Sequence, residues 1–286
     1  MNPLILYHDN CFDGFYAAWV FHRVFPSAKF KAVQYESTPP DVTGYDVFIV
    51  DFSYSRAVTE QLAATANSIV ILDHHRTALS ALEGLPYATF DMSKSGARLA
   101  WEYVWDHAPN QTVKDGWHTR EHPPWIVQYV EDRDLWKFSL PASREVNAAI
   151  RSYPKTFELF DQYYSGQSWE LVSQGTAILR AEQQIVQEHL PHARPLKFKG
   201  VEPSGLVVNA TILISEIAQS LAISEAFGAV FVQRLDGSQL WSLRARPDGA
   251  DVRLIAEKFG GGGHKQAAGF KLNSWQEYLD LVEVTL

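Results

Sequence analysis

The sequence predicts an α/β protein: a parallel sheet with helices on both faces, followed by a smaller α/β domain. Apolar runs at residues 4–7, 45–50 and 69–72 have the length of buried strands, and segments of helical length follow the first two. This alternation of strand and helix is the order that builds a parallel sheet. Beyond residue 205, short strand patterns and the hairpin signal Asp236-Gly237 indicate a second sheet.

Length and composition indicate two domains. The chain has 286 residues, of which 46% are hydrophobic, so it can bury a large core. A long helical pattern, 168–190, is closed by Pro191, and we expect the domains to be 1–190 and 191–286. No apolar run approaches the length of a membrane span, and the single cysteine, Cys11, fits a reducing compartment. We therefore expect a cytoplasmic protein with no membrane partner.

The charge of the chain narrows the choice of partners. A formal charge of −8 and a pI near 5.7 argue against binding of long duplex nucleic acid, which depends on many Lys and Arg contacts to phosphate. Short phosphorylated ligands remain allowed.

Polar side chains follow each of the three N-terminal strands. His8 and Asp13 follow the first, Asp51 the second, and the cluster Asp73 to Arg76 the third. Because the carboxyl ends of parallel strands lie at one edge of a sheet, these residues are expected to meet there. Carboxylate and imidazole are ligands for divalent metals, although an isolated His-His pair is more often a solvated surface turn.

The middle of the chain carries three further features. A helix is expected to start within 93–97, with a serine as N-cap, and such a start can hold an anion. Residues 106–124 are polar and proline-bounded, which predicts a surface loop. Helical spacing returns at Trp125 and leads into the charge cluster 131–134, which taken alone is more often a salt-bridged helix end than a metal site.

Near the C-terminus, the glycine run 260–263 is followed at once by His264 and Lys265. Backbone amides in such a loop can form an anion-binding nest, whereas the ordinary alternative is a flexible tether. Arg244 lies on a predicted strand, where phosphate contact and a solvated outer face are equally compatible with the pattern.

Two separated motifs resemble a known family. Leu72-Asp73-His74-His75, with Asp13-Gly14 and Asp51 upstream, is followed near the C-terminus by Gly261-Gly262-Gly263-His264 and Ala267-Ala268-Gly269. This arrangement resembles the DHH/DHHA1 phosphoesterases, which include RecJ-like nucleases, oligoribonuclease-type enzymes and cyclic-dinucleotide phosphodiesterases. The resemblance implies a DHH domain that holds two divalent ions, usually Mn2+ with Mg2+ as an alternative, and a smaller DHHA1 domain that binds the nucleotide end of the substrate across a cleft.

The resemblance also implies roles for individual residues. Asp51 matches the bridging acid, and Asp134 competes with Asp132 for the place of the last metal-binding acid. Asp73 and His75 would orient ligands, touch phosphate or assist proton transfer, and Arg76 would hold a phosphate oxygen. Taking the resemblance and the residue patterns together, we expect the metal ligands to be His8, Asp13, Asp51, His74 and Asp132, and the substrate-binding residues to be Arg244, Gly261, Gly262, Gly263 and His264.

The first motif departs from the family pattern at Cys11. That motif usually has two acids separated by one residue, and here Cys11 stands at the earlier position. His8 or Asp9 could supply the missing ligand. Alternatively, Cys11 could bind a soft ion such as zinc or simply pack beside the site.

The function expected from these residues is that of a metal-dependent phosphodiesterase. It would cleave short oligonucleotides or dinucleotides to nucleoside monophosphates through a metal-activated water. A 3′,5′-bisphosphonucleotide phosphatase and a cyclic-dinucleotide phosphodiesterase are alternatives of the same class. A non-catalytic nucleotide-binding sensor is the alternative from another class, and the sequence is compatible with a homodimer.

Overall fold

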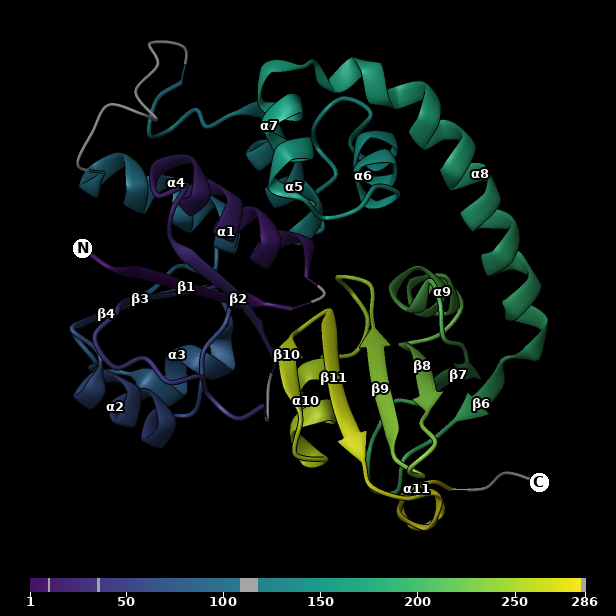
Figure 1. Cartoon of the computed structure of the whole chain (residues 1–286). Coiled ribbons are helices and arrows are strands. Elements are labelled where there is room, and N and C mark those ends of the chain that lie inside the picture. The colour runs from purple at the N-terminus through teal and green to yellow at the C-terminus, as the bar shows by residue number, and fades with distance from the viewer. Residues whose placement is uncertain (10, 35–36, 109–117, 284–286) are drawn as a thin grey trace. The chain divides into compact units, whose positions relative to one another are not determined.

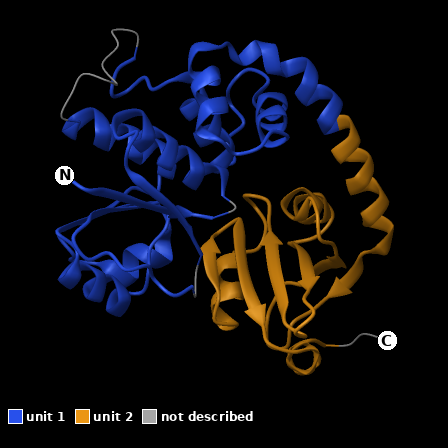
Figure 2. Cartoon of the chain, viewed as in Figure 1, with its two compact units in different colours: residues 1–179 blue, residues 180–286 orange. Residues whose placement is uncertain are grey.

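The computed structural model describes the chain except residues 10, 35–36, 109–117 and 284–286. It divides into two compact units, residues 1–179 and 180–286 (Figure 2). The division falls inside helix α8 (Val172–His189), earlier than the expected boundary at residue 190. Among the described residues, no helix is both long and apolar enough to span a membrane.

The first unit is built on a five-stranded sheet with the order β2-β1-β3-β4-β5 (Figure 1). Every pairing in it is parallel. Since β1 has β2 on one side and β3 on the other, the direction of chain winding reverses between β1 and β3, and ligands of open α/β sheets bind at such a switch point. The strands are β1 (Pro3–His8), β2 (Lys29–Val33), β3 (Asp46–Val50), β4 (Ser68–Asp73) and β5 (Ala88–Phe90).

Both faces of this sheet are covered, because successive apolar residues of each strand point to opposite sides. Ile5, Phe48 and Leu72 pack with helices α1 (Phe12–Val24) and α4 (Gly96–His107). Leu6, Ile49 and Ile71, on the other face, share a core with Leu62 of α2 (Arg56–Thr65) and Leu82 of α3 (Arg76–Leu82). The structure confirms the predicted fold class.

A helical group extends the core on the α1 side. Helix α1 is buried on most of its surface because α4 packs along it and α7 covers it with aromatic rings, as in the edge contact between Tyr16 and Phe160. The predicted loop 106–124 is shorter at its start, because α4 continues to His107, and residues 109–117 of it lie outside the described part of the chain. The added elements are α5 (Trp125–Asp134), α6 (Ser143–Arg151), α7 (Phe157–Ser165) and the 3-10 turn η1 (Ser168–Leu171).

The second unit is a six-stranded sheet with the order β10-β11-β9-β8-β7-β6. The predicted turn at Asp236-Gly237 joins the antiparallel pair β8 and β9, and Gly237 takes a φ of 85°, which glycine adopts without steric cost. Trp241 and Phe270 pack with α10 on one face, and Val208 and Val230 pack with α9 on the other. The elements are η2 (Leu190–His192), β6 (Arg194–Leu196), β7 (Gly205–Asn209), α9 (Ile214–Leu221), β8 (Gly228–Gln233), β9 (Gln239–Arg244), α10 (Val252–Lys258), β10 (Gly262–His264), β11 (Ala267–Leu272) and α11 (Trp275–Leu281).

Candidate metal centre

The predicted polar residues of the first unit meet at the switch point of its sheet. His8 ends β1, Asp51 follows β3 directly, and His74 and His75 follow β4. Asp51 has a φ of 55°, in the left-handed region that an aspartate enters at some cost. This turn sets the Asp51 carboxylate between the histidines of the two neighbouring strands.

His74 faces three carboxylates. Its Nε2 lies 3.1 Å from Asp51 Oδ1, 3.6 Å from Asp134 Oδ2 and 3.7 Å from Asp13 Oδ2. Burial alone would lower the pKa of His74, but the hydrogen bond with Asp51 and the surrounding negative charges outweigh it and raise the pKa to about 10. The ring is therefore a cation in the ion-free protein and partly balances the three acids.

A second group of potential ligands lies on the other side of Asp51. Atoms of His8, Cys11 and Asp51 lie within 4.8 Å of one another, as do atoms of Asp13, His74 and Asp134 in the first group. Asp51 contributes one oxygen toward each side, since Oδ1 meets His74 whereas Oδ2 lies 3.8 Å from His8 Nδ1. Oδ2 is fully buried and has no hydrogen-bond partner.

Asp13 is fixed by the start of helix α4. Its carboxylate accepts hydrogen bonds from the backbone N–H groups of Gly96 and Ala97, and the side chain of Ser95 caps the helix by accepting from Arg98 N–H. The anion that this helix start holds is thus a carboxylate of the chain itself. Burial, followed by the charges of Asp134 and Asp51, raises the pKa of Asp13 well above its ordinary value.

Asp73 is completely buried, and both of its oxygens are occupied. Oδ1 accepts from His75 Nδ1 at 2.6 Å and from the backbone N–H of His74 at 2.7 Å, while Oδ2 accepts from Ser53 at 2.5 Å. This placement favours the orienting role expected for Asp73 over direct contact with phosphate. His75 is partly exposed beside it, and Arg76 is exposed in the first turn of α3.

In the second unit, Arg244 and His264 lie in one row across the sheet. Arg244 of β9 pairs with Ala267 of β11, which pairs with His264 of β10. Directly paired residues point to the same face, so the two side chains flank a small alanine on one face. Arg244 donates a hydrogen bond to Ser215 of α9 at 2.7 Å.

The glycine run of this unit is part of a hairpin. Gly262 and Gly263 belong to β10 and pair with β11. A Cβ on Gly261 would lie 2.1 Å from the carbonyl oxygen of Gly269, and one on Gly263 would lie 2.5 Å from that of Ala267. These glycines therefore permit close packing of the two strands, which rules out a simple tether.

Comparisons with known proteins agree with this architecture. No family model matches the chain. An uncharacterized protein of Acanthamoeba polyphaga mimivirus is 25% identical over 93% of this chain, which spans 66% of that protein's length. The bifunctional oligoribonuclease and PAP phosphatase NrnA of Mycoplasma pneumoniae is 24% identical over 81% of this chain and 75% of its own length. A pGpG-specific phosphodiesterase from Vibrio shares the fold with a TM-score of 0.50 and 13% identity, covering 98% of this chain and 96% of that one.

NrnA is an enzyme of the DHH family, and its similarity to this chain extends across both units. The chain is therefore similar in sequence to an enzyme of this family, and it shares the fold of the Vibrio protein.

The side chains of this site fit a centre of two divalent ions. Three carboxylates converge on one imidazole within a buried site, and like charges at such distances repel unless a cation lies between them. The Oδ2 of Asp51 points to the same need, because this buried carboxylate oxygen has no hydrogen-bond partner. Asp13, Asp51, His74 and Asp134 could hold one ion, and His8, Cys11 and Asp51 the other.

The structure favours Asp134 over the expected Asp132 as the last acid of the candidate metal centre. Asp132 accepts hydrogen bonds from Ser139 N–H at 2.9 Å, Ser139 Oγ at 2.7 Å and Leu140 N–H at 3.3 Å. Its carboxylate is thus committed to the turn that follows α5. Asp134, the last residue of that helix, is the one that reaches His74.

Two parts of the candidate metal centre were not predicted from the sequence. Ser53, which donates to Asp73, gave no signal because serines beside a strand end are common. Gly96 lies where a Cβ would be 2.5 Å from Asp51 Cβ and 3.0 Å from Asp13 Oδ2. The expected anion-binding helix start included Gly96, but its contact with two ligand acids depends on strands distant in sequence.

Proposed function

We propose that this chain is a metal-dependent phosphodiesterase that hydrolyses short oligonucleotides or dinucleotides to nucleoside monophosphates. The observation that carries the proposal is Asp51, whose two oxygens face two separate groups of metal-binding side chains at the switch point of the sheet. Divalent ions held there, with Mn2+ or Mg2+ as candidates, would activate a water and neutralise charge on the phosphate. The cytoplasmic location and a homodimer remain predictions.

The other residues of the first unit would position the reacting groups. The hydrogen bond from His75 Nδ1 to Asp73 fixes the imidazole ring, and this partly exposed ring is our candidate for proton transfer to the leaving oxygen. Arg76, one residue further on, is our candidate for holding a phosphate oxygen. In the second unit, Arg244, His264 and the hairpin glycines Gly261, Gly262 and Gly263 are the proposed substrate-binding residues.

A second candidate is hydrolysis of 3′,5′-bisphosphonucleotides. It is favoured by the similarity to the Mycoplasma relative, which is both an oligoribonuclease and a PAP phosphatase. Both reactions need the same metal centre, so one site can serve both. A non-catalytic sensor would bind such nucleotides without releasing product.

The first test is Asp51→Asn in the purified full chain. The change removes one negative charge shared by both ligand groups, so turnover of dinucleotides and bisphosphonucleotides should fall by roughly a thousandfold or more, in line with loss of metal-centred catalysis. Product release is measured by chromatography at saturating Mn2+, and circular dichroism checks the fold. Turnover by the Asp51→Asn variant near that of the original protein would overturn the assignment. If the original protein itself binds nucleotides but releases no product, the sensor would be favoured.

A further inference from the structure

The two ligand groups of the metal centre differ in chemistry. The acid group, Asp13, His74 and Asp134, has two carboxylates and one imidazole, together with Oδ1 of Asp51. The mixed group, His8, Cys11 and Asp51, offers an imidazole, a thiol and a carboxylate. Nitrogen, sulfur and oxygen in one small group form a softer ligand set than carboxylates do.

We propose that Cys11 binds metal through its sulfur and makes the mixed group selective for a thiophilic ion such as Zn2+, Co2+ or Fe2+. The acid group would retain preference for a harder ion such as Mn2+ or Mg2+. This inference rests on the proposed two-ion centre and adds that its two positions are unequal. On coordination, the thiol proton passes to solvent and a metal–sulfur bond forms.

The position of Cys11 supports the assignment. It is the N-cap residue of α1, a helix of 13 residues, and lies in the turn that joins this helix to His8 at the end of β1. Its sulfur lies within 4.8 Å of ligand atoms of both His8 and Asp51.

An independent observation is the carboxylate of Asp51. Its side chain is only 1% exposed, and Oδ2 faces the mixed group without a hydrogen-bond partner, while Oδ1 is engaged by His74. A cation in the mixed group supplies the missing partner. The alternative ligand Asp9 lies outside the metal-binding groups of the described residues, and its carboxylate accepts from Gln34 at 2.8 Å.

The test uses the fact that Cys11 is the only cysteine in the chain. Metal-free protein is titrated with Co2+ or Cd2+ while the ultraviolet charge-transfer absorption of a metal–thiolate bond is recorded, and calorimetry counts the bound ions. We expect two ions per chain, one of which generates the absorption. Any such absorption must arise from Cys11.

Five variants test whether the absorption arises in the site. Cys11→Ser should abolish it, whereas His8→Ala and Asp51→Asn should leave the thiol in place but raise the Cd2+ concentration needed for it by roughly tenfold or more. Asp134→Asn should weaken the other binding step and keep the absorption. Cys11→Asp, which replaces sulfur by a hard oxygen ligand, should shift the preference of the mixed group from Cd2+ toward Mn2+ by about the same factor.

Two results would overturn the inference: two ions bound with no thiolate absorption, or an absorption that is indifferent to His8→Ala and Asp51→Asn. The second would mean that the thiol captures Cd2+ by itself. Hydrolysis is measured separately, so a protein that hydrolyses dinucleotides without thiolate ligation refutes only this inference. Thiolate ligation without hydrolysis refutes only the proposed function.

Discussion

At the scale of single residues, Asp51 has a strained backbone and a buried side chain, and its two carboxylate oxygens face different groups of potential metal ligands. Its left-handed backbone, with a φ of 55°, carries a cost of about 1 kcal/mol or more for a residue other than glycine. The backbone N–H of Asp51 donates to Leu72 O, which holds this turn against β4. An extended backbone at this residue would aim the carboxylate elsewhere, so the strain serves the metal site.

We predict that substitutions of Asp132 and Asp134 have opposite effects on metal binding and on stability. Asp134→Asn should weaken Mn2+ binding by roughly tenfold or more and should not reduce the stability of the ion-free protein, since it removes one of several crowded acids. Asp132→Asn should leave Mn2+ affinity near its original value but cost about 1–3 kcal/mol of unfolding free energy, because an amide cannot accept all of the hydrogen bonds from Ser139 and Leu140.

Calorimetric Mn2+ titration and urea unfolding of both variants check this pair. The reverse pattern, with Asp132→Asn losing the metal, would restore Asp132 as the ligand.

These two residues also show where prediction from sequence ends. His8, Asp51 and His74 were expected at the site because the end of an apolar run is visible in the sequence and parallel strands end at one edge. Asp132 and Asp134 stand two positions apart on a helix and so point in quite different directions. Only the packing of α5 against α4 and the hydrogen bonds of the following turn determine which one faces His74.

At the scale of elements, the start of α4 organises the acids. Gly96→Ala would place a methyl group against Asp51 and Asp13, at 2.5 Å and 3.0 Å, so the helix start or both acids must move. We expect Mn2+ affinity to fall by roughly tenfold or more. Ser95→Ala is the control: it removes the N-cap and costs about 1 kcal/mol of stability, but keeps the amides that hold Asp13. Equal losses of Mn2+ affinity in both variants, measured by calorimetry, would show that general loosening of α4 is responsible.

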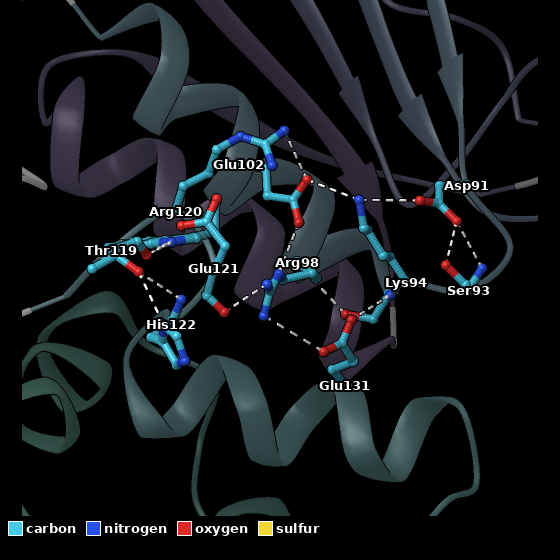
Figure 3. A network of polar contacts seen from close by, with 12 residues as sticks. Asp91, Ser93, Lys94, Arg98, Glu102, Thr119, Arg120, Glu121, His122 and Glu131 are labelled. Carbon is cyan, nitrogen blue, oxygen red and sulfur yellow. Dashed lines mark hydrogen bonds and ion pairs between the residues drawn. The ribbon is translucent and has the colours of Figure 1, made fainter.

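A charged network secures the outer part of the same helix (Figure 3). Glu102, with a side chain 8% exposed, pairs with Lys94 at 2.9 Å, Arg98 at 3.0 Å and Arg120 at 3.1 Å. Burial acts to raise the pKa of Glu102, but the hydrogen bonds from Lys94 and Arg98 outweigh it and lower the pKa below its ordinary value of 4.5. The folded protein therefore keeps this carboxylate ionised at a lower pH than the unfolded chain does.

The sign of this pKa change predicts how stability depends on pH. Glu102→Gln should cost about 1–3 kcal/mol at pH 7, because the partly exposed cations Lys94 and Arg98 lose an ionised partner that is itself buried. The contribution of Glu102 is fully present well above pH 4.5 and is lost as pH falls through the lower folded pKa, so the two proteins should converge in acid. Urea unfolding across this range measures the difference. Glu60→Gln, which removes an exposed pair with Arg56, should change stability by less than about 1 kcal/mol. If the difference in unfolding free energy between the original protein and Glu102→Gln stays constant with pH, ionisation of Glu102 is not the source of its contribution.

Elements with a clear period were predictable and those that depend on distant contacts were not. The strands β1, β3 and β4 were recognised as short apolar runs between polar residues, and the β8–β9 hairpin was recognised from Asp236-Gly237. The glycine run was expected as a loop, but Gly262 and Gly263 form a strand because β11 offers an adjacent backbone. Whether these glycines form a strand depends on backbone pairing between β10 and β11, which the sequence of the glycine run alone does not reveal.

At the scale of the whole molecule, each unit has its own sheet and core, as composition and element order predicted. The division inside α8 was not predicted, since a continuous helical pattern carries no mark where its contacts change from one unit to the other. Pro191 ends the helix but does not divide the units. The boundary between two compact units depends on which side chains pack together. In a continuous helix that contributes to both units, the sequence does not show where the contacts pass from one unit to the other.

The last prediction assigns separate tasks to the two units. If the second unit binds one end of a nucleotide substrate, His264→Ala should raise the KM for a dinucleotide by roughly tenfold, because an anion loses a hydrogen-bond donor on the row shared with Arg244. A small generic phosphodiester that needs only the metal centre should be hydrolysed at nearly the original rate. Lys271→Ala, on the same strand as Ala267 but four positions away, provides a control that removes a different cation from β11. Steady-state kinetics on both substrates test this prediction. An equal fall of kcat on the two substrates would mean that His264 supports the catalytic residues themselves. Unchanged kinetics on both substrates would mean that His264 does not contact the substrate.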